Sequence, residues 1–138
     1  MTGPIILVDD DPDDHFIALE AIQELGLPNE IKTFLSSEDA LKYLTGNLVE
    51  QPFIIICDVN MPRMNGIALK RAIEGNEELR RKSIPFVYYS TSASKSVVNE
   101  AYELQVQGFF IKGQSISQVE EVFKLILGYW KECRHPNS

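Results

Sequence analysis

The sequence predicts an α/β fold in which a doubly wound, five-stranded parallel sheet carries helices on both faces. Five short apolar runs alternate with segments in which apolar residues recur at helical spacing. The central run is continuous rather than alternating, which is typical of a strand covered on both faces. Strands that alternate with helices indicate right-handed crossovers between parallel strands. The 138 residues are enough for one domain of this kind, spanning 1–138.

Composition and charge narrow the class of protein. Apolar residues make up 44% and charged residues 24% of the chain, as in ordinary soluble globular domains. The net charge of −7 argues against nucleic-acid binding, because phosphate backbones are bound by clustered Lys and Arg. The sequence has no signal-peptide pattern and no membrane-length apolar run, and Cys57 and Cys133 lie in unlike surroundings. We therefore expect a cytoplasmic protein with no disulfide and no membrane partner.

The first strand is predicted at Ile5–Val8 and the first helix from Pro12 to about Leu25. Pro12 suits the first position of a helix, which makes Asp11 its N-cap. The pair Asp13–Asp14 then faces the positive end of the helix dipole, which is a structural role. The pair Asp9–Asp10 is left at the end of the strand without such a role.

The next two elements are an edge strand and a capped helix. Ile31–Leu35 carries Lys32 within an apolar run, which indicates a strand at an edge of the sheet. Ser36 and Asp39 form a variant of the capping box at the start of a helix that Gly46 ends.

The central strand is predicted at Phe53–Cys57 and ends in one carboxylate, Asp58. A loop rich in Asn and Pro follows, and a helix runs from Gly66 to Gly75. The polar segment Glu77–Ser83 indicates at most one helical turn. The remaining predictions are a strand at Phe86–Tyr89, a helix at Ser94–Leu104, a strand at Gly108–Ile111, a helix at Ser115–Trp130 and a polar tail at 131–138 without a core of its own. These elements give five helices and the flavodoxin-like strand order 2-1-3-4-5.

Reactive side chains follow four of the five predicted strands. Asp9 and Asp10 come after the first, Asp58 after the third, Ser90 after the fourth and Lys112 after the fifth. Because the carboxyl ends of parallel strands share one edge of the sheet, we expect these side chains to converge. Three carboxylates so close together repel one another unless a hard divalent cation such as Mg²⁺ lies among them. Asp58 alone could equally cap a turn, but its partners favour phosphoryl transfer onto its carboxylate.

These motifs carry a family resemblance. The pair Asp9–Asp10, the DVNMPRMNG segment Asp58–Gly66, the hydroxyl of Ser90 and the FIK segment ending in Lys112 resemble the receiver domains of bacterial response regulators, the CheY-like family. The resemblance covers residues 5–130. It implies a two-component signalling protein, not an enzyme, whose phosphoryl group comes from a phosphohistidine on a sensor histidine kinase or a phosphotransfer protein.

The resemblance also implies a role for each reactive residue. Asp58 would be the phosphoacceptor. Asp10, Asp58 and the backbone carbonyl of Asn60 would hold Mg²⁺, and Asp9 would support the ion through water. Lys112 would pair with the phosphoryl group.

The resemblance further implies a switch that changes a protein-binding face. Ser90 would be the switch hydroxyl, with Thr91 in its place if the strand ends one residue later. Phe109 would be the switch aromatic, although an aromatic in a buried strand is as often part of the core. No output domain is visible, so we expect a downstream protein or a second copy to dock on the face Ser94–Trp130. Small regulators that resemble this chain often partner photoreceptor or other sensor kinases.

Two positions depart from the family pattern. Gly113 stands where the family normally has a proline in a cis peptide bond after Lys112. Without proline the cis form costs about 2.5–4 kcal/mol, which favours a trans bond and a looser loop, although the sequence does not decide the isomer. Thr91 follows Ser90 where Ala or Gly is common, and its methyl group would crowd the phosphoryl pocket.

Two other classes of protein share the predicted fold. A flavodoxin-like electron carrier would need a hydroxyl- and glycine-rich phosphate loop after the first strand, where Asp9–Asp10 would repel a flavin phosphate. A phosphohydrolase would need its nucleophile in a DxDx[TV] motif, which the chain lacks. His15 and His135 have no partner at metal-ligand spacing, and we expect both to be surface residues.

Overall fold

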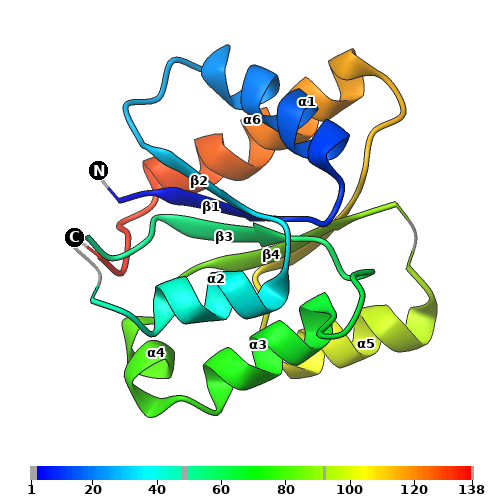
Figure 1. The fold of residues 1–138 in the computed structure, drawn as a ribbon. Coiled ribbons are helices and arrows are strands. Elements are labelled where there is room, and N and C mark those ends of the chain that lie inside the picture. Colours follow the sequence, from blue (N-terminus) through cyan, green and yellow to red (C-terminus); the bar gives the residue numbers. More distant parts are fainter. Residues whose placement is uncertain (1–2, 48–49, 92, 138) are drawn as a thin grey trace.

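The computed structural model describes residues 3–47, 50–91 and 93–137. Its described strands form one sheet in the order β2-β1-β3-β4-β5, and every neighbouring pair is parallel. This order confirms the predicted doubly wound fold, with β2 at an edge (Figure 1). The strands are β1 (Ile5–Val8), β2 (Ile31–Phe34), β3 (Ile54–Cys57), β4 (Phe86–Ser90) and β5 (Gly108–Ile111).

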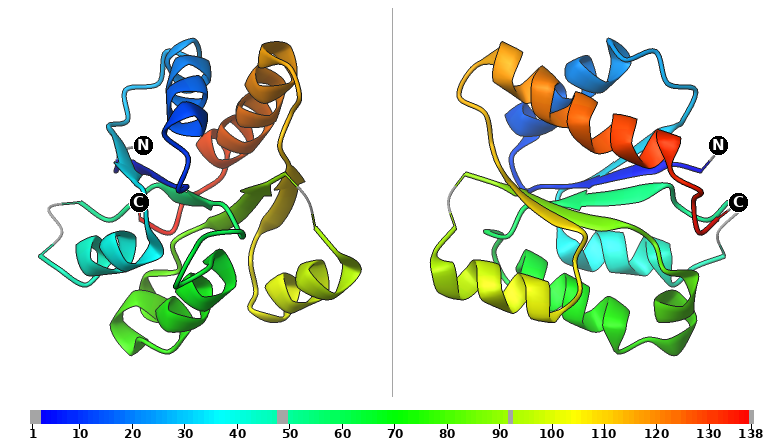
Figure 2. Two further views of the ribbon diagram at one scale, coloured as in Figure 1. Left: turned by 45° about the vertical axis from the view of Figure 1, so that its right-hand side comes forward. Right: turned by 180° about the vertical axis from the view of Figure 1, so that it is seen from behind.

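Helices cover both faces of the sheet (Figure 2). Helices α1 and α6 lie on one face, and α2, α3, α4 and α5 lie on the other. Their bounds are α1 (Pro12–Gln23), α2 (Ser37–Leu44), α3 (Gly66–Glu74), α4 (Glu77–Lys82), α5 (Lys95–Glu103) and α6 (Ile116–Glu132). None of these helices is long and apolar enough to cross a membrane, among the residues that the structure describes.

The predicted number of helices, five, is too low by one. The polar segment expected to form at most a turn is the helix α4. The Asn76 side chain accepts a hydrogen bond from the Leu79 amide at 3.0 Å and so caps the helix, and Leu79 is its one buried residue. A single apolar residue gives no helical periodicity, which explains why the pattern did not predict α4.

The three central strands, β1, β3 and β4, bury both of their faces, as their apolar runs predict, whereas the edge strands β2 and β5 are partly exposed. Along β1, Ile6 and Val8 join one core cluster while Ile5 and Leu7 join the other. The first cluster packs under α2 to α5 and the second under α1 and α6. Successive residues of such a strand face opposite cores, and each core needs apolar residues. Every position of the strand is therefore apolar, and the sequence shows no alternation of apolar and polar residues.

The tail and the last helix depart from the prediction. Helix α6 continues to Glu132, and the residues after it fold back against the sheet. His135 is 2% exposed and its ring stacks on Phe53 with the centroids 4.8 Å apart. Its Nε2 donates to the carbonyl oxygen of Phe53 at 2.5 Å, and its Nδ1 accepts from the Asn137 amide at 3.0 Å. The prediction that His135 is a surface residue is therefore wrong.

Candidate functional site

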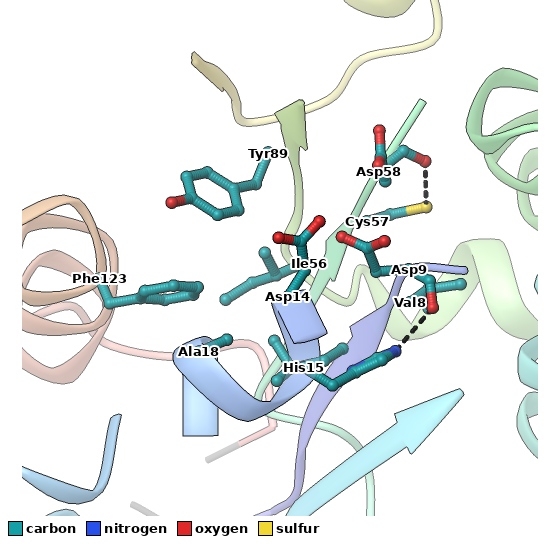
Figure 3. A pocket seen from close by; sticks show the side chains of 11 residues that line it. Val8, Asp9, Asp14, His15, Ala18, Ile56, Cys57, Asp58, Tyr89 and Phe123 are labelled. Atoms are coloured by element: carbon teal, nitrogen blue, oxygen red, sulfur yellow. Dashed lines mark hydrogen bonds between the residues drawn. The ribbon is translucent and has the colours of Figure 1, made fainter. Parts of the chain in front are cut away.

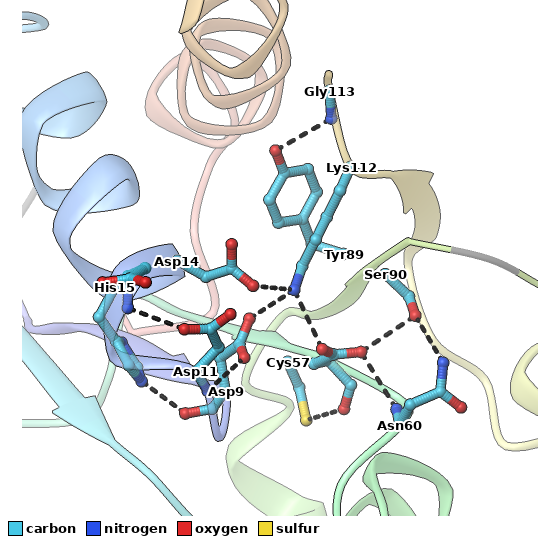
Figure 4. A network of polar contacts seen from close by, with 12 residues as sticks. Asp9, Asp11, Asp14, His15, Cys57, Asn60, Tyr89, Ser90, Lys112 and Gly113 are labelled. Atoms are coloured by element: carbon cyan, nitrogen blue, oxygen red, sulfur yellow. Dashed lines mark hydrogen bonds and ion pairs between the residues drawn. The ribbon is translucent and has the colours of Figure 1, made fainter. Parts of the chain in front are cut away.

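The reactive side chains meet at the carboxyl edge of the sheet (Figure 4). Val8 of β1 pairs with Cys57 of β3, so the next residues, Asp9 and Asp58, emerge side by side. Ser90 is the last residue of β4, and Lys112 follows β5 directly. The convergence expected from the ends of the strands is present in the fold.

Lys112 holds the centre of this cluster. Its Nζ lies 2.6 Å from Asp9 Oδ2, 2.8 Å from Asp14 Oδ2 and 3.0 Å from Asp58 Oδ2. An ammonium group has three N–H donors, so these three carboxylates use all of them. Burial alone would lower the pKa of Lys112, but the hydrogen bonds to Asp14, Asp9 and Asp58 outweigh burial and raise it. The lysine is therefore a fixed positive charge.

Asp58 is 7% exposed and both of its oxygens are oriented. Oδ1 accepts from Ser90 Oγ at 3.0 Å and from the Asn60 amide at 3.1 Å, while Oδ2 faces Lys112. Ser90 is fully buried and Thr91 is exposed, so Ser90 is the hydroxyl that reaches the carboxylate. This arrangement answers the question of register left open by the sequence.

Three carboxylates form the acidic cluster that the sequence predicts. One oxygen each from Asp9, Asp10 and Asp58 lies within 4.8 Å of the others, and Asp10 is open to solvent. Burial raises the pKa of Asp9, although hydrogen bonds from Lys112 and from the Asp11 amide oppose the rise. Oxygen donors at this spacing suit a small hard cation, so the residues fit a divalent metal.

Phe109 lies where a switch residue is expected, at half-buried depth in β5. Its ring packs 5.5 Å from the ring of Tyr88, on the face of the sheet that α5 covers. The structure describes a single position of this ring, so its role in switching stays a prediction.

Two residues of the site were missed by sequence reasoning. Asp14 was assigned to the helix dipole, yet its carboxylate reaches Lys112. No local pattern indicates this contact, because Lys112 comes 98 residues later in the chain. His15 was expected at the surface but is 7% exposed, and its Nε2 donates to the carbonyl oxygens of Asp9 at 2.6 Å and Phe34 at 3.1 Å.

A small cavity lies behind these groups (Figure 3). It measures about 20 Å³ and is lined on its polar side by Asp9, Asp14, His15 and Asp58. That volume suits one water molecule, because a buried water needs about 10–15 Å³.

The loop after Lys112 is fixed by a hydrogen bond that proline could not make. Every peptide bond among the described residues is trans, including that between Lys112 and Gly113. The Gly113 amide donates to the hydroxyl of Tyr89 at 3.3 Å, and the Tyr89 ring packs on Phe123. The sequence left the isomer of this bond open, and the tyrosine contact gives the loop a support that the sequence did not reveal.

The sequence of this chain is similar to those of known proteins. Residues 5–124 match the response regulator receiver domain family. The chain is 28% identical over 129 residues to the probable methanogenesis regulatory protein FilR2 of Methanothrix harundinacea, covering 91% of this chain and 82% of that protein. It is 26% identical over 132 residues to the response regulator Rcp1 of Synechocystis sp., covering 93% of this chain and 88% of Rcp1.

The fold of this chain is also similar to the solved structures of response regulators. The phosphorylated cyanobacterial phytochrome response regulator RcpA has a TM-score of 0.85 to this chain at 28% identity, covering 96% of each chain. The Mn²⁺-bound form of response regulator Rcp1 has a TM-score of 0.83 at 25% identity, covering 94% of this chain and 95% of that one. Both likenesses extend over nearly the whole chain.

Proposed function

Since this chain belongs to the response regulator receiver domain family, we propose that it is a signalling protein that takes a phosphoryl group onto Asp58. The observation that carries the proposal is the orientation of the Asp58 carboxylate. Lys112, Ser90 and the Asn60 amide each donate to it, at 3.0, 3.0 and 3.1 Å. These are the donors that three phosphoryl oxygens would need around the same carboxylate.

The proposed step is an in-line transfer from a phosphohistidine. An oxygen of Asp58 forms the new O–P bond, the P–N bond to the imidazole breaks, and its electron pair stays on the imidazole nitrogen. No general base is required, because a carboxylate is already ionised at neutral pH. Lys112 and Ser90 then donate to oxygens of the transferred group.

Asp10, Asp58 and the backbone carbonyl of Asn60 would hold a Mg²⁺ ion in this step, with Asp9 supporting it through water. The ion would neutralise charge on the phosphoryl oxygens when bound. The observation in favour is the spacing of the three carboxylates, within 4.8 Å of one another. The similar response regulator Rcp1 has been crystallised in a Mn²⁺-bound form, which supports binding of a divalent ion by this chain.

The proposed donor is a sensor histidine kinase or a phosphotransfer protein. RcpA is a phytochrome response regulator, so a phytochrome-type kinase is the first donor to test.

The proposed output surface is the face Ser94–Trp130, where a downstream protein or a second copy would dock. Ser90 would move toward the new phosphoryl oxygens, and Phe109 would turn into the space behind it. Exposed apolar residues on this face favour a protein partner: Tyr102, Ile111, Ile116, Leu125 and Tyr129.

Mass spectrometry after treatment with acetyl phosphate and Mg²⁺ tests the proposal. The protein should gain the mass of one phosphoryl group, which hydroxylamine should remove because acyl phosphates are labile. Asp58→Asn should abolish the gain. Asp13→Asn, an exposed residue of the same charge, should leave it unchanged. Labelling that persists in Asp58→Asn would place the acceptor elsewhere and overturn the assignment.

A further inference from the structure

We propose that Asp14 is a positioning residue that keeps Lys112 in the site while the acidic cluster holds a cation. The inference deepens the proposed function and rests on it where phosphorylation is concerned. Asp14 stands in the first turn of α1, and its carboxylate lies 2.8 Å from Lys112 Nζ (Figure 4).

The three carboxylates that pair with Lys112 differ in whether they also belong to the acidic cluster that could bind a cation. Asp9 and Asp58 belong to the acidic cluster, so the oxygens that accept from Lys112 share carboxylates with the expected cation site. Asp14 lies outside that cluster. It is thus the one carboxylate of the three for which Lys112 does not compete with a cation.

The difference matters because a bound cation and the Lys112 ammonium group carry charges of the same sign. A divalent cation beside Asp9 and Asp58 repels the ammonium group and competes for the same carboxylates. The side chain of Lys112 is only 7% exposed, so it cannot exchange these partners for water without leaving the site. A negative charge outside the acidic cluster offsets the repulsion, and Asp14 supplies it.

The first turn of α1 is held firmly enough for this role. The Asp11 side chain accepts from the Asp13 amide at 2.9 Å and caps the helix. His15 ties the same turn to the carbonyl oxygens of Asp9 and Phe34. A carboxylate on a fixed turn loses little freedom on pairing with Lys112, so the contact is stronger than that of an exposed surface pair.

Replacing Asp14 by Asn keeps the shape of the side chain and removes the charge. Lys112 must then compete with the cation for Asp9 and Asp58, so the Kd for Mg²⁺ measured by calorimetry should rise about tenfold. Phosphorylation by acetyl phosphate at saturating Mg²⁺ should slow by a similar factor. Asp13→Asn removes the same charge from the same turn without touching Lys112, so its effects should stay within about twofold.

Two further measurements separate a positioning role from a general loss of charge. In the Lys112→Ala background, Asp14→Asn and Asp13→Asn should have equal effects on Mg²⁺ affinity, because the residue through which Asp14 acts is gone. The NMR signals of the Lys112 methylene next to Nζ should stay restrained on adding Mg²⁺ to the unsubstituted protein and become mobile in Asp14→Asn. Asp14→Glu should restore part of the restraint.

The outcomes distinguish this inference from the proposed function. Equal Mg²⁺ affinities and equal lysine signals in Asp14→Asn and Asp13→Asn would overturn the positioning role, whether or not Asp58 is phosphorylated. A protein that shows the predicted differences in metal affinity and lysine mobility but gains no phosphoryl group would support the positioning role and overturn the proposed function.

Discussion

Asp9 is a buried carboxylate whose ionised form is disfavoured by its surroundings. Burial raises its pKa above the ordinary value of 3.8, and the hydrogen bonds from Lys112 and the Asp11 amide do not cancel that rise. A carboxyl whose pKa is higher in the folded than in the unfolded state contributes most to stability when protonated. Its contribution is full below the unfolded pKa and is lost as the pH rises through the folded pKa. At neutral pH the ionised Asp9 therefore costs stability unless a cation is bound.

Asp9→Asn should reveal this cost. In the presence of a chelator at neutral pH, the variant should melt a few degrees above the unsubstituted protein, and the gap should close toward about pH 4. Added Mg²⁺ should reverse the order, because only the unsubstituted protein keeps all three carboxylates of the cluster. Thermal melting across pH measures the effect, with Asp13→Asn as the control. A variant that is less stable at neutral pH without metal would contradict the prediction.

At the scale of elements, apolar runs that end in charged residues made the strands and the site predictable. Ile5–Val8 and Gly108–Ile111 are the strands at the predicted bounds, and Asp9 and Lys112 follow them into one cluster. The signal was strong because a buried parallel strand must be apolar throughout, whereas its end need not be.

What the sequence did not reveal depends on contacts between distant segments. Asp14 looked like an ordinary first-turn carboxylate, since nothing local shows that Lys112, from the other end of the chain, lies above it. His15 and His135 are polar residues that become buried because backbone carbonyls accept from them. A pattern of apolar residues cannot locate such partners, because burial of a polar group depends on its hydrogen bond.

The segment after α6 contributes one buried side chain, His135, to the packing of the protein. His135→Ala removes the ring stacked on Phe53 and leaves the Phe53 carbonyl without its donor, so it should lower the free energy of unfolding by about 2 kcal/mol. Chemical denaturation measures the loss. Arg134→Ala, at an exposed neighbouring position, should change stability by less than about 0.5 kcal/mol. Equal effects of the two substitutions would show that the tail carries no core contact.

For the whole molecule, the proposed output through the face Ser94–Trp130 requires a route from Asp58 to that face. Ser90 ends β4 and Lys112 follows β5, so two of the three donors to Asp58 stand directly at the ends of these paired strands. Beryllofluoride, a phosphoryl mimic, should therefore shift NMR signals across Ser94–Trp130 as well as in the loops around Asp58. Ser90→Ala should abolish the distant shifts and keep the local ones. Shifts confined to the loops would rule out this route.

The docked tail also decides where the two described ends of the chain lie. Asn137 donates to the carbonyl oxygen of Gln51, whose neighbourhood includes Gly3, and Figure 1 shows both ends together. They lie at the amino edge of the parallel sheet, opposite the acidic cluster. An affinity tag, fluorophore or sensor-chip tether at either end would thus leave the reactive edge facing outward. A short bridge between the ends would permit circular permutation, with new termini opened in a surface loop.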